Sequence, residues 1–296
     1  MEYAESDGLL DSREWDIAFH GRLIDYRSAE SKAYMLAHSR CAYEFYYDAE
    51  NLEWSLDGQN CGSVDDIEKI FLEKQLDAKH ILIDSTTLNF AEILILFQTY
   101  KLFGTTQIDA LYLEPAKYKV PSERLIESRH FQLSAKIKGF LAIPKHALSF
   151  ESNDLAVVLC GYEGERLGHA FEEYDINGEF CRLIFGMPPY SYGWDMNSYV
   201  NFLPIISNNN IAQTFDYCPA ANPLAVYEKL CTIYESIDQY QKMFILPFGT
   251  KPMSLGAVLF IINNPNHNIS VLYDHPVVSE DCTTDVIKWN LYKITL

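Results

Sequence analysis

The feature that most constrains the fold of this chain is a regular alternation of short apolar runs with longer segments of helical spacing. In the second half, such segments separate the apolar runs at 155–159, 181–185, 213–217, 243–246 and 269–273. In the first half, runs at 80–83 and 108–113 flank a helical segment at 90–103. Strands that alternate with helices form parallel sheets covered on both faces. We therefore predict an α/β protein of two Rossmann-like halves, with mostly parallel sheets and helices on both faces.

The alternation is interrupted once, at residues 144–153. The chain has 296 residues, 48% of them hydrophobic, which is enough for two ordinary domains. We predict an N-terminal α/β domain at 1–150, with a β-hairpin around Asp48–Asn51 and a strand pair at 131–143. The C-terminal Rossmann-like domain is predicted at 151–296.

The chain is acidic, with a formal net charge of −18. An acidic surface repels phosphates, so we expect no non-specific binding of nucleic acid. The charge either serves solubility or faces a basic protein partner.

The spacing of the cysteines and the N-terminal sequence indicate the cellular compartment of the protein. The seven cysteines are widely spaced and include no CxxC pair, so they signal neither a zinc site nor a thioredoxin-type motif. They are typical of small buried residues in a reducing compartment. The first ten residues lack the apolar core of a signal peptide, and the run at 91–97 is too short to span a bilayer. We expect a cytoplasmic protein that does not bind membranes.

The most distinctive motif runs from Pro247 to Ser254, between an apolar run and a helical segment. Gly249 lets a ligand approach the backbone closely, and Thr250 is placed to cap the helix. The helix start and the Lys251 ammonium favour an anion such as phosphate, with Ser254 in the first turn. The alternative is a capped turn with a solvated lysine. The spacing is not that of a Walker A loop.

The segment Gly249-Thr250-Lys251-Pro252-Met253 resembles the GTKxM-type motif of CARF domains, the CRISPR-associated Rossmann-fold sensors of cyclic oligoadenylates. The resemblance covers residues 155–275. In that family a second glycine usually precedes the threonine, and an effector domain commonly follows the CARF unit. The resemblance implies a cyclic nucleotide ligand and a homodimer with the ligand at its two-fold axis. The whole chain also resembles bacterial proteins of the phage-defence kind.

A second motif, Gly161-Tyr162-Glu163-Gly164-Glu165-Arg166, follows the first strand of the same half. A nucleotide-binding fold places its first ligand loop there, although the spacing is not GxGxxG. Arg166 is suited to bidentate phosphate binding, and either Glu163 or Glu165 to ribose hydroxyls or to a role as general base. The alternative is an internal Glu–Arg pair near a helix start.

The first half offers a second candidate site. Asp84, Ser85 and Thr86 follow one predicted strand, and Glu114 ends the next. A hydroxyl-rich turn at a helix start holds an anion or simply caps the helix. If the two strands are neighbours, Asp84 and Glu114 would pair for metal binding or acid–base work.

The remaining motifs give weaker signals. Tyr190 and Trp194 lie in a Pro-rich loop after a strand, where they either stack on a base or cover the end of the sheet. No HExxH, HxH or Cys–His spacing occurs, so we expect no metal site. No GxSxG elbow occurs, and Cys218 has no identifiable partner base.

These observations leave three hypotheses. The first is a nucleotide-binding sensor or regulatory subunit, with bacterial anti-phage defence as its setting. The second is an enzyme acting on a nucleotide or nucleoside phosphate, with a carboxylate as base. The third is a non-catalytic interaction subunit of a larger complex. The sequence contains no complete set of catalytic residues, which favours the first and third hypotheses over the second. The fold alone does not distinguish between the three.

Overall fold

The chain folds into two compact units. The computed structural model describes residues 2–6, 14–118, 131, 133–211, 215–238, 240–265, 268–280 and 282–296. Unit 1 comprises residues 1–119 and 278–296, and unit 2 comprises residues 120–277. These bounds differ from the predicted halves at 1–150 and 151–296. The reason is β15 (Thr283–Thr295), which pairs along its length with β7 (Gln107–Tyr118) and so completes unit 1.

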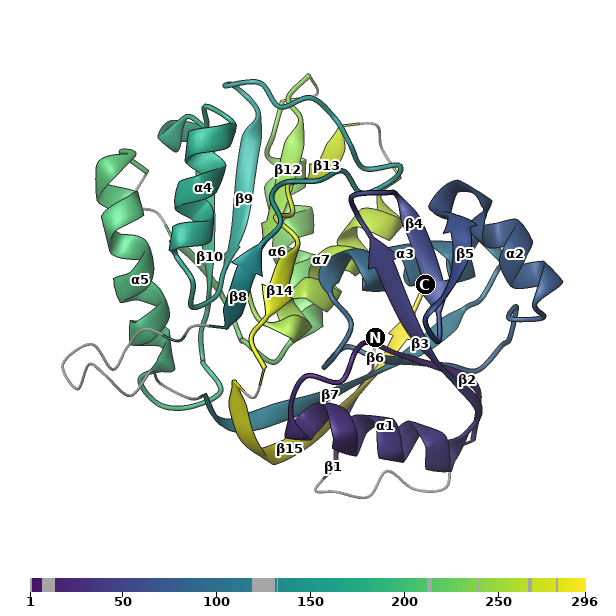
Figure 1. The fold of residues 1–296 in the computed structure, drawn as a ribbon. Coiled ribbons are helices and arrows are strands. Elements are labelled where there is room, and N and C mark those ends of the chain that lie inside the picture. The colour runs from purple at the N-terminus through teal and green to yellow at the C-terminus, as the bar shows by residue number, and fades with distance from the viewer. Residues whose placement is uncertain are drawn as a thin grey trace. The chain divides into compact units, whose positions relative to one another are not determined.

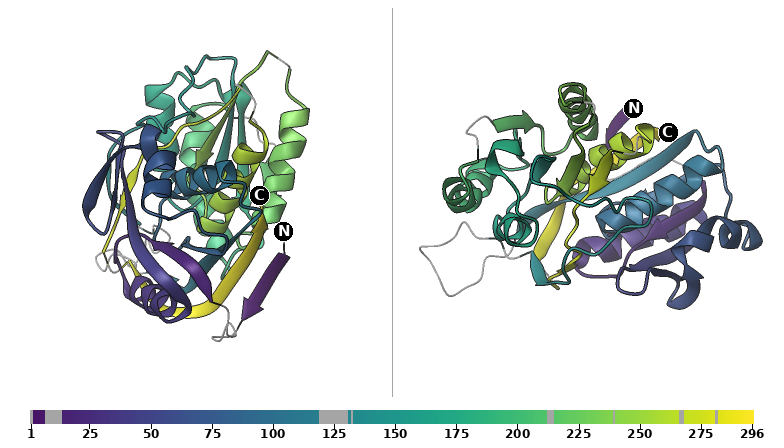
Figure 2. Two further views of the ribbon diagram at one scale, coloured as in Figure 1. Left: turned by 90° about the vertical axis from the view of Figure 1, so that its right-hand side faces the viewer. Right: turned by 90° about the horizontal axis from the view of Figure 1, so that it is seen from above.

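Unit 1 contains an eight-stranded mixed sheet in the order β1-β15-β7-β6-β2-β3-β4-β5. Its four inner strands β7, β6, β2 and β3 are parallel, and the flanking strands are antiparallel. Figure 2 shows β15, in yellow, beside β7. The other strands are β1 (Glu2–Ser6), β2 (Trp15–His20), β3 (Ser39–Asp48), β4 (Glu53–Leu56), β5 (Gln59–Ser63) and β6 (Ile81–Asp84).

Helices cover both faces of the unit 1 sheet. Helix α1 (Tyr26–His38) buries Met35 against Ala18, Leu82 and Leu111 on one face. On the other face, Phe19 stacks with Phe71 of α2 (Ile67–Glu73), which follows a 3-10 turn at Val64–Asp66. Helix α3 (Phe90–Leu102) is buried over most of its length, and its Tyr100 ring packs on Phe19.

Unit 2 contains a five-stranded sheet in which every pair is parallel, in the order β11-β10-β9-β12-β13. In chain order this is 3-2-1-4-5, the order of a Rossmann-like half. The strands are β9 (Leu155–Cys160), β10 (Cys181–Gly186), β11 (Phe215–Cys218), β12 (Met243–Pro247) and β13 (Ile269–Val271). A separate two-stranded sheet joins β8 (Ser134–Ile137) to β14 (Pro276–Val278).

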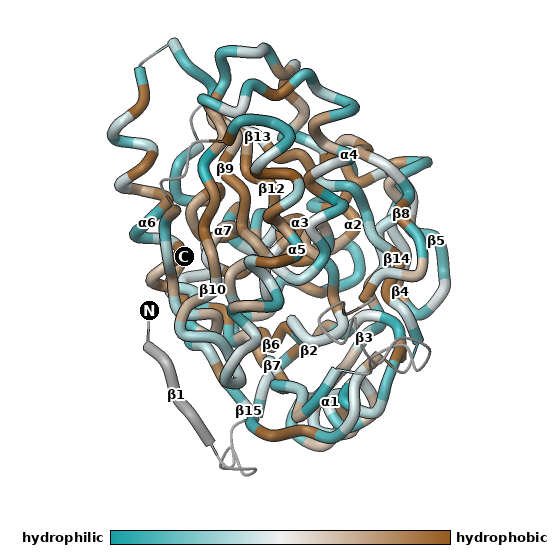
Figure 3. The backbone as a smooth tube through the Cα atoms, turned by 90° about the vertical axis from the view of Figure 1, so that its left-hand side faces the viewer, coloured by the Kyte–Doolittle hydropathy of each residue, from teal (hydrophilic) through white to brown (hydrophobic). Residues whose placement is uncertain are grey.

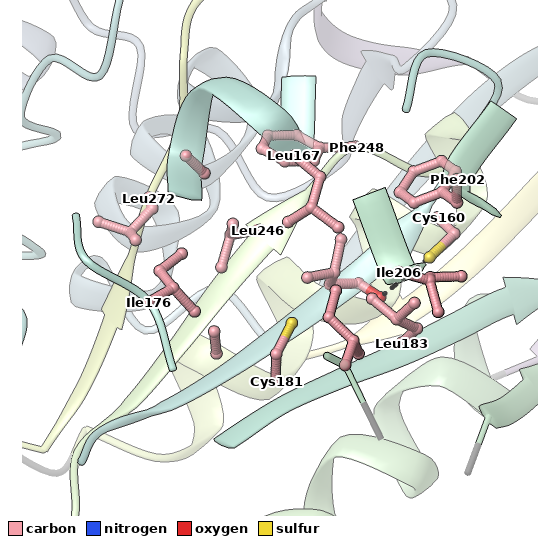
Figure 4. Close-up of a cluster of buried hydrophobic side chains, with 14 of the residues drawn as sticks. Cys160, Leu167, Ile176, Cys181, Leu183, Phe202, Ile206, Leu246, Phe248 and Leu272 are labelled. Carbon is pink, nitrogen blue, oxygen red and sulfur yellow. Dashed lines mark hydrogen bonds between the residues drawn. The ribbon is translucent and has the colours of Figure 1, made fainter. Parts of the chain in front are cut away.

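Two helix pairs cover the two faces of this sheet (Figure 1). Strands β9 and β12 are hydrophobic along their length (Figure 3), as expected for strands buried on both faces. Helices α4 (Glu165–Glu173) and α5 (Trp194–Asn208) supply Leu167, Phe202 and Ile206 to one core, shown in Figure 4. Helices α6 (Pro223–Glu235) and α7 (Lys251–Asn263) pack on each other, and a 3-10 turn at Gly178–Phe180 precedes β10.

The predicted fold class is confirmed, and so is the hairpin of β3 and β4. The strand pair predicted at 131–143 is wrong, because only β8 forms and its partner is β14. Strand β7 continues through Pro115, where a strand end was expected, to Tyr118. Of the strand predicted at 213–217, residues 213 and 214 lie outside the described residues. Within the described residues, no helix is long and apolar enough to cross a membrane.

Candidate functional site

The strand order of unit 2 reverses between β9 and β12. From β9 the chain proceeds outward through β10 to β11, whereas β12 and β13 lie on the opposite side of β9. In open α/β sheets, ligands bind beyond the carboxyl ends of the strands at such a switch point. The two predicted loops, Gly161–Gly164 and Phe248–Thr250, follow β9 and β12 and therefore meet at this point.

The two loops are in backbone contact. A Cβ atom built on Gly161 would lie 2.0 Å from the carbonyl oxygen of Phe248, so only glycine is tolerated there. Helix α5 holds the first loop from the other side. The Ser198 hydroxyl donates to the Gly161 carbonyl at 2.5 Å, and the Asn201 amide donates to the Tyr162 carbonyl at 2.6 Å. Gly161 therefore serves the packing of the loops on each other.

Thr250 is the N-cap of α7, as predicted. Its hydroxyl accepts from the Met253 N–H at 3.4 Å and donates to the Ala220 carbonyl at 2.6 Å. Its carbonyl accepts from the N–H of Ser254, a residue 4% exposed inside the first turn. Lys251 is the first residue of α7 and is partly exposed. The structure thus brings the predicted Thr250, Lys251 and Ser254 together at one helix start, with Gly249 packed between Leu159 and Met253.

Arg166 occupies a different role from the predicted phosphate clamp. Its Nε and Nη2 atoms donate to the two carboxylate oxygens of Asp274, at 2.8 and 2.5 Å. Its guanidinium also lies 4.4 Å from the centre of the Phe248 ring. Burial lowers the pKa of Arg166, but the hydrogen-bonded Asp274 carboxylate more than offsets this and keeps the group charged. The bidentate fork thus binds the carboxylate of Asp274, where the alternative interpretation had expected a glutamate of the motif.

Glu163 is also bound within unit 2. Its Oε1 accepts from the N–H groups of Leu133 at 2.9 Å and Ser134 at 2.7 Å. Its Oε2 accepts from the Ser134 hydroxyl at 2.7 Å. These bonds connect the loop after β9 to the start of β8. Both carboxylate oxygens of Glu163 therefore bind groups of the protein in this structure, where binding to ribose had been predicted.

The aromatic loop after β10 divides into anchored and exposed parts. The Tyr190 hydroxyl donates to the Ala220 carbonyl at 3.1 Å, the same oxygen that Thr250 binds. Trp194 packs edge-on against Phe131 and Tyr162, with ring centroids 5.6 and 6.0 Å away. Both residues therefore cover the end of the sheet, which was the alternative left open for them.

Unit 1 repeats the arrangement of the switch point. Gly21 follows β2, and a Cβ atom on it would lie 2.7 Å from the carbonyl oxygen of Thr87, in the loop after β6. The Gly21 N–H also donates to the Thr87 hydroxyl at 2.8 Å. The carboxylate of Asp25 lies at the start of α1, the helix that follows Gly21. It caps this helix and accepts a hydrogen bond from Arg27 at 3.0 Å.

The second candidate site in unit 1 is a set of internal hydrogen bonds. Asp84 is fully buried and accepts from the Thr86 N–H at 2.8 Å and the Thr87 hydroxyl at 2.7 Å. Ser85 donates its hydroxyl to the Leu111 carbonyl at 2.8 Å. The Thr86 hydroxyl accepts from the Leu113 N–H at 3.0 Å. The helix cap predicted for this turn is wrong as well, because the N-cap of α3 is Asn89, whose side chain accepts from the Glu92 N–H.

The pairing of Asp84 with Glu114 does not occur. Their strands β6 and β7 are neighbours, as the hypothesis required, but Asp84 is in register with Leu111. Side chains alternate between faces along a strand, so Glu114 points to the face opposite Asp84. Among the described residues, no group of three or more His, Cys, Asp or Glu side chains is arranged to hold a metal ion.

Two other features bear on function. Burial raises the pKa of Cys218 to about 11, which makes it a poor nucleophile at neutral pH. A cavity of about 890 Å³ lies in unit 1 beside Trp15, Ile81 and Gln107, at the amino ends of β2, β6 and β7. It is lined by none of the predicted site residues.

Asp274 is the residue that the sequence interpretation missed. It comes three positions after the end of β13, at the same carboxyl edge as the two predicted loops. A carboxylate directly after an apolar run was the available signal, and the rule used for Glu114 would have identified it.

Comparisons with known proteins assign no family. No protein-family model matches the chain, and no curated protein matches it. Among solved structures, a C2-type ketoreductase from a modular polyketide synthase aligns with a TM-score of 0.21 and 10% identity, covering 88% of this chain and 68% of that one. The sirohydrochlorin chelatase SirB from Bacillus subtilis subspecies spizizenii, in complex with cobalt, aligns with a TM-score of 0.20 and 10% identity, covering 88% and 87%.

Proposed function

We propose that unit 2 binds a small phosphate-bearing ligand, a nucleotide in the first instance, and acts as a sensor or regulatory subunit. The observation that carries the proposal is the contact between the loops after β9 and β12 at the point where the strand order reverses. Lys251 supplies the positive charge, and the start of α7 supplies a favourable dipole.

The resemblance of Gly249-Thr250-Lys251 to the CARF motif supports cyclic oligoadenylates as the first ligands to test. It also supports a homodimer and a role in bacterial antiviral defence, inside the cytoplasm. A protein partner in a defence complex is part of the same proposal.

The internal bonds of the candidate carboxylates favour sensing over catalysis. Glu163 accepts three hydrogen bonds from Leu133 and Ser134, and Asp84 accepts two from its own turn. A general base has to reach its substrate proton with a lone pair at hydrogen-bond distance. Catalysis through Glu163 or Asp84 would therefore require that carboxylate to leave its present partners, which leaves the exposed Glu165 as the third candidate base.

A thermal-shift screen tests the proposal. The panel contains ATP, ADP, a cyclic dinucleotide and cyclic oligoadenylates, each with and without Mg²⁺. A ligand at about 100 times its dissociation constant stabilises the folded state by about 2.7 kcal/mol, which is readily measured. We expect at least one nucleotide to raise the melting temperature of the wild type and to raise that of Lys251→Ala much less.

Lys229→Ala is the matched control. It removes the same charge from unit 2, but Lys229 lies on α6 and binds Asp216 on the edge strand β11. Its ligand response should equal that of the wild type. The proposal fails if no nucleotide stabilises the wild type, or if Lys251→Ala responds as fully as Lys229→Ala. If a stabilising nucleotide is converted to a product, the protein is an enzyme and the sensor hypothesis is wrong.

A further inference from the structure

A segment of unit 2, residues 133–141, lies across the carboxyl edge of the parallel sheet and is fastened to it at two places. We call this segment the strap. One fastening is Glu163, in the loop after β9, which accepts from Leu133 and Ser134. The other is the chain after β13, where the Gly139 N–H donates to the Asp274 carbonyl at 3.2 Å and the Lys138 N–H to the His275 carbonyl at 3.4 Å.

The strap and the proposed ligand loop share one residue. Glu163 lies between Gly161 and Arg166, the stretch that faces the switch point. Two consecutive backbone N–H groups and a hydroxyl converge on its carboxylate, which is the donor arrangement of a small anion nest. The nest is filled by the protein's own carboxylate.

Charge makes the fastening and ligand entry compete. A phosphate that enters the loop after β9 approaches the Glu163 carboxylate, and like charges at short range repel strongly at a partly buried site. Arg166 relieves this repulsion only in part, because its Nε and Nη2 atoms are hydrogen-bonded to Asp274, whose carboxylate balances its charge. Movement of Glu163 away from the loop would break the bonds that hold Leu133 and Ser134.

We propose that Glu163 is the latch of the strap, and that entry of a phosphate-bearing ligand at the β9 loop releases the Leu133–Ser134 end of the strap from the sheet edge. The inference rests on the proposed function and adds its regulation. By linkage, whatever weakens the latch must strengthen ligand binding, because strap closure and ligand entry exclude each other. The released strap carries β8, which is paired to β14, and so it transmits ligand binding to that two-stranded sheet.

Ser134→Ala tests the latch. The change removes one of the three hydrogen bonds to Glu163 and leaves Gly161, Arg166 and Lys251 untouched. Ser149→Ala is the matched control, because Ser149 lies outside the strap and the change removes only a hydroxyl. Two quantities are measured for each protein: amide hydrogen exchange of residues 133–141, and the dissociation constant of the nucleotide that most stabilises the wild type.

The latch predicts faster exchange of the strap in Ser134→Ala without ligand, and a three- to ten-fold tighter dissociation constant. It also predicts faster strap exchange in the wild type when the nucleotide is added. If the nucleotide binds the wild type and Ser134→Ala equally, the latch is wrong and the proposed function stands. If no nucleotide binds the wild type, Ser134→Ala or Glu163→Gln, the proposed function fails and the latch fails with it.

Discussion

Replacement of Gly161 by alanine is expected to destabilise unit 2 by about 3 kcal/mol or more. The new Cβ would lie 2.0 Å from the Phe248 carbonyl oxygen, whereas ordinary contacts begin at 3.4 Å. The obstacle is backbone that directly follows β12, and β12 is paired to β9, so no side-chain rotation relieves the clash. Overpacking of a well-packed interior typically costs ~1–3 kcal/mol, and a clash with fixed backbone belongs at the upper end of that range.

Gly168→Ala is the matched control for this change. Gly168 lies inside α4, and the nearest atom to a new Cβ is the Cδ1 of Ile205 at 3.2 Å, the far end of a flexible side chain. Alanine is favoured over glycine in a helix interior by ~1 kcal/mol. The control should therefore be neutral or slightly stabilising.

Urea denaturation followed by circular dichroism and by tryptophan fluorescence measures the effect. Trp194 is the single tryptophan in residues 120–277 and the other three lie in unit 1, so the fluorescence reports both units together. The free energy of unfolding is compared between the two variants and the wild type. If Gly161→Ala unfolds at the same urea concentration as the wild type, the two loops are not in contact and the description of the switch point is wrong.

Three further predictions concern the same edge of the sheet. Asp274→Ala should cost about 3–5 kcal/mol in a denaturant titration, because it leaves a buried charge on Arg166, whereas the double change Arg166→Met with Asp274→Leu should cost far less; equal losses would contradict the ion pair. Burial lowers the pKa of His275 to about 4. As pH falls from ~6.5 to 4, the unfolded chain takes up the proton first, so this group should cost up to ~3 kcal/mol of stability. His275→Gln should remove this part of the pH profile and leave that of His146, whose pKa burial also lowers to about 4; an unchanged profile would refute the assignment. Thr250→Ala should lower the free energy of unfolding by the ~0.5–2 kcal/mol of a lost N-cap, and a free energy equal to that of the wild type in a denaturant titration would argue against the cap.

The parts of the fold that could be predicted are those with a local signal. The alternation of apolar runs with helical segments identified all five strands of the unit 2 sheet, and the signal was clearest for β9, β12 and β13, which are buried along their whole length. The start of α7 could be predicted from Thr250, because an N-cap bond joins residues only three positions apart.

The parts that were missed depend on distant pairings. Strand β15 finds its partner β7 more than 160 positions earlier, and its alternating side chains give no strong apolar run. Pro115 looked like a strand end, but it faces Val286 beside a shift in register, where a proline is tolerated. Arg166 pairs with Asp274, which lies 108 residues later in the chain, and is therefore not available to the proposed ligand. No local spacing of residues predicts this pairing.

Amide hydrogen exchange of the full chain, with and without a saturating cyclic oligoadenylate or ATP, shows whether a phosphate-bearing ligand binds where the loops after β9 and β12 meet. We expect slower exchange in both loops, residues 161–164 and 248–251, and no such protection in the turn at 84–87 of unit 1. Protection confined to unit 1, or unchanged exchange in both loops while the nucleotide is bound, would contradict it.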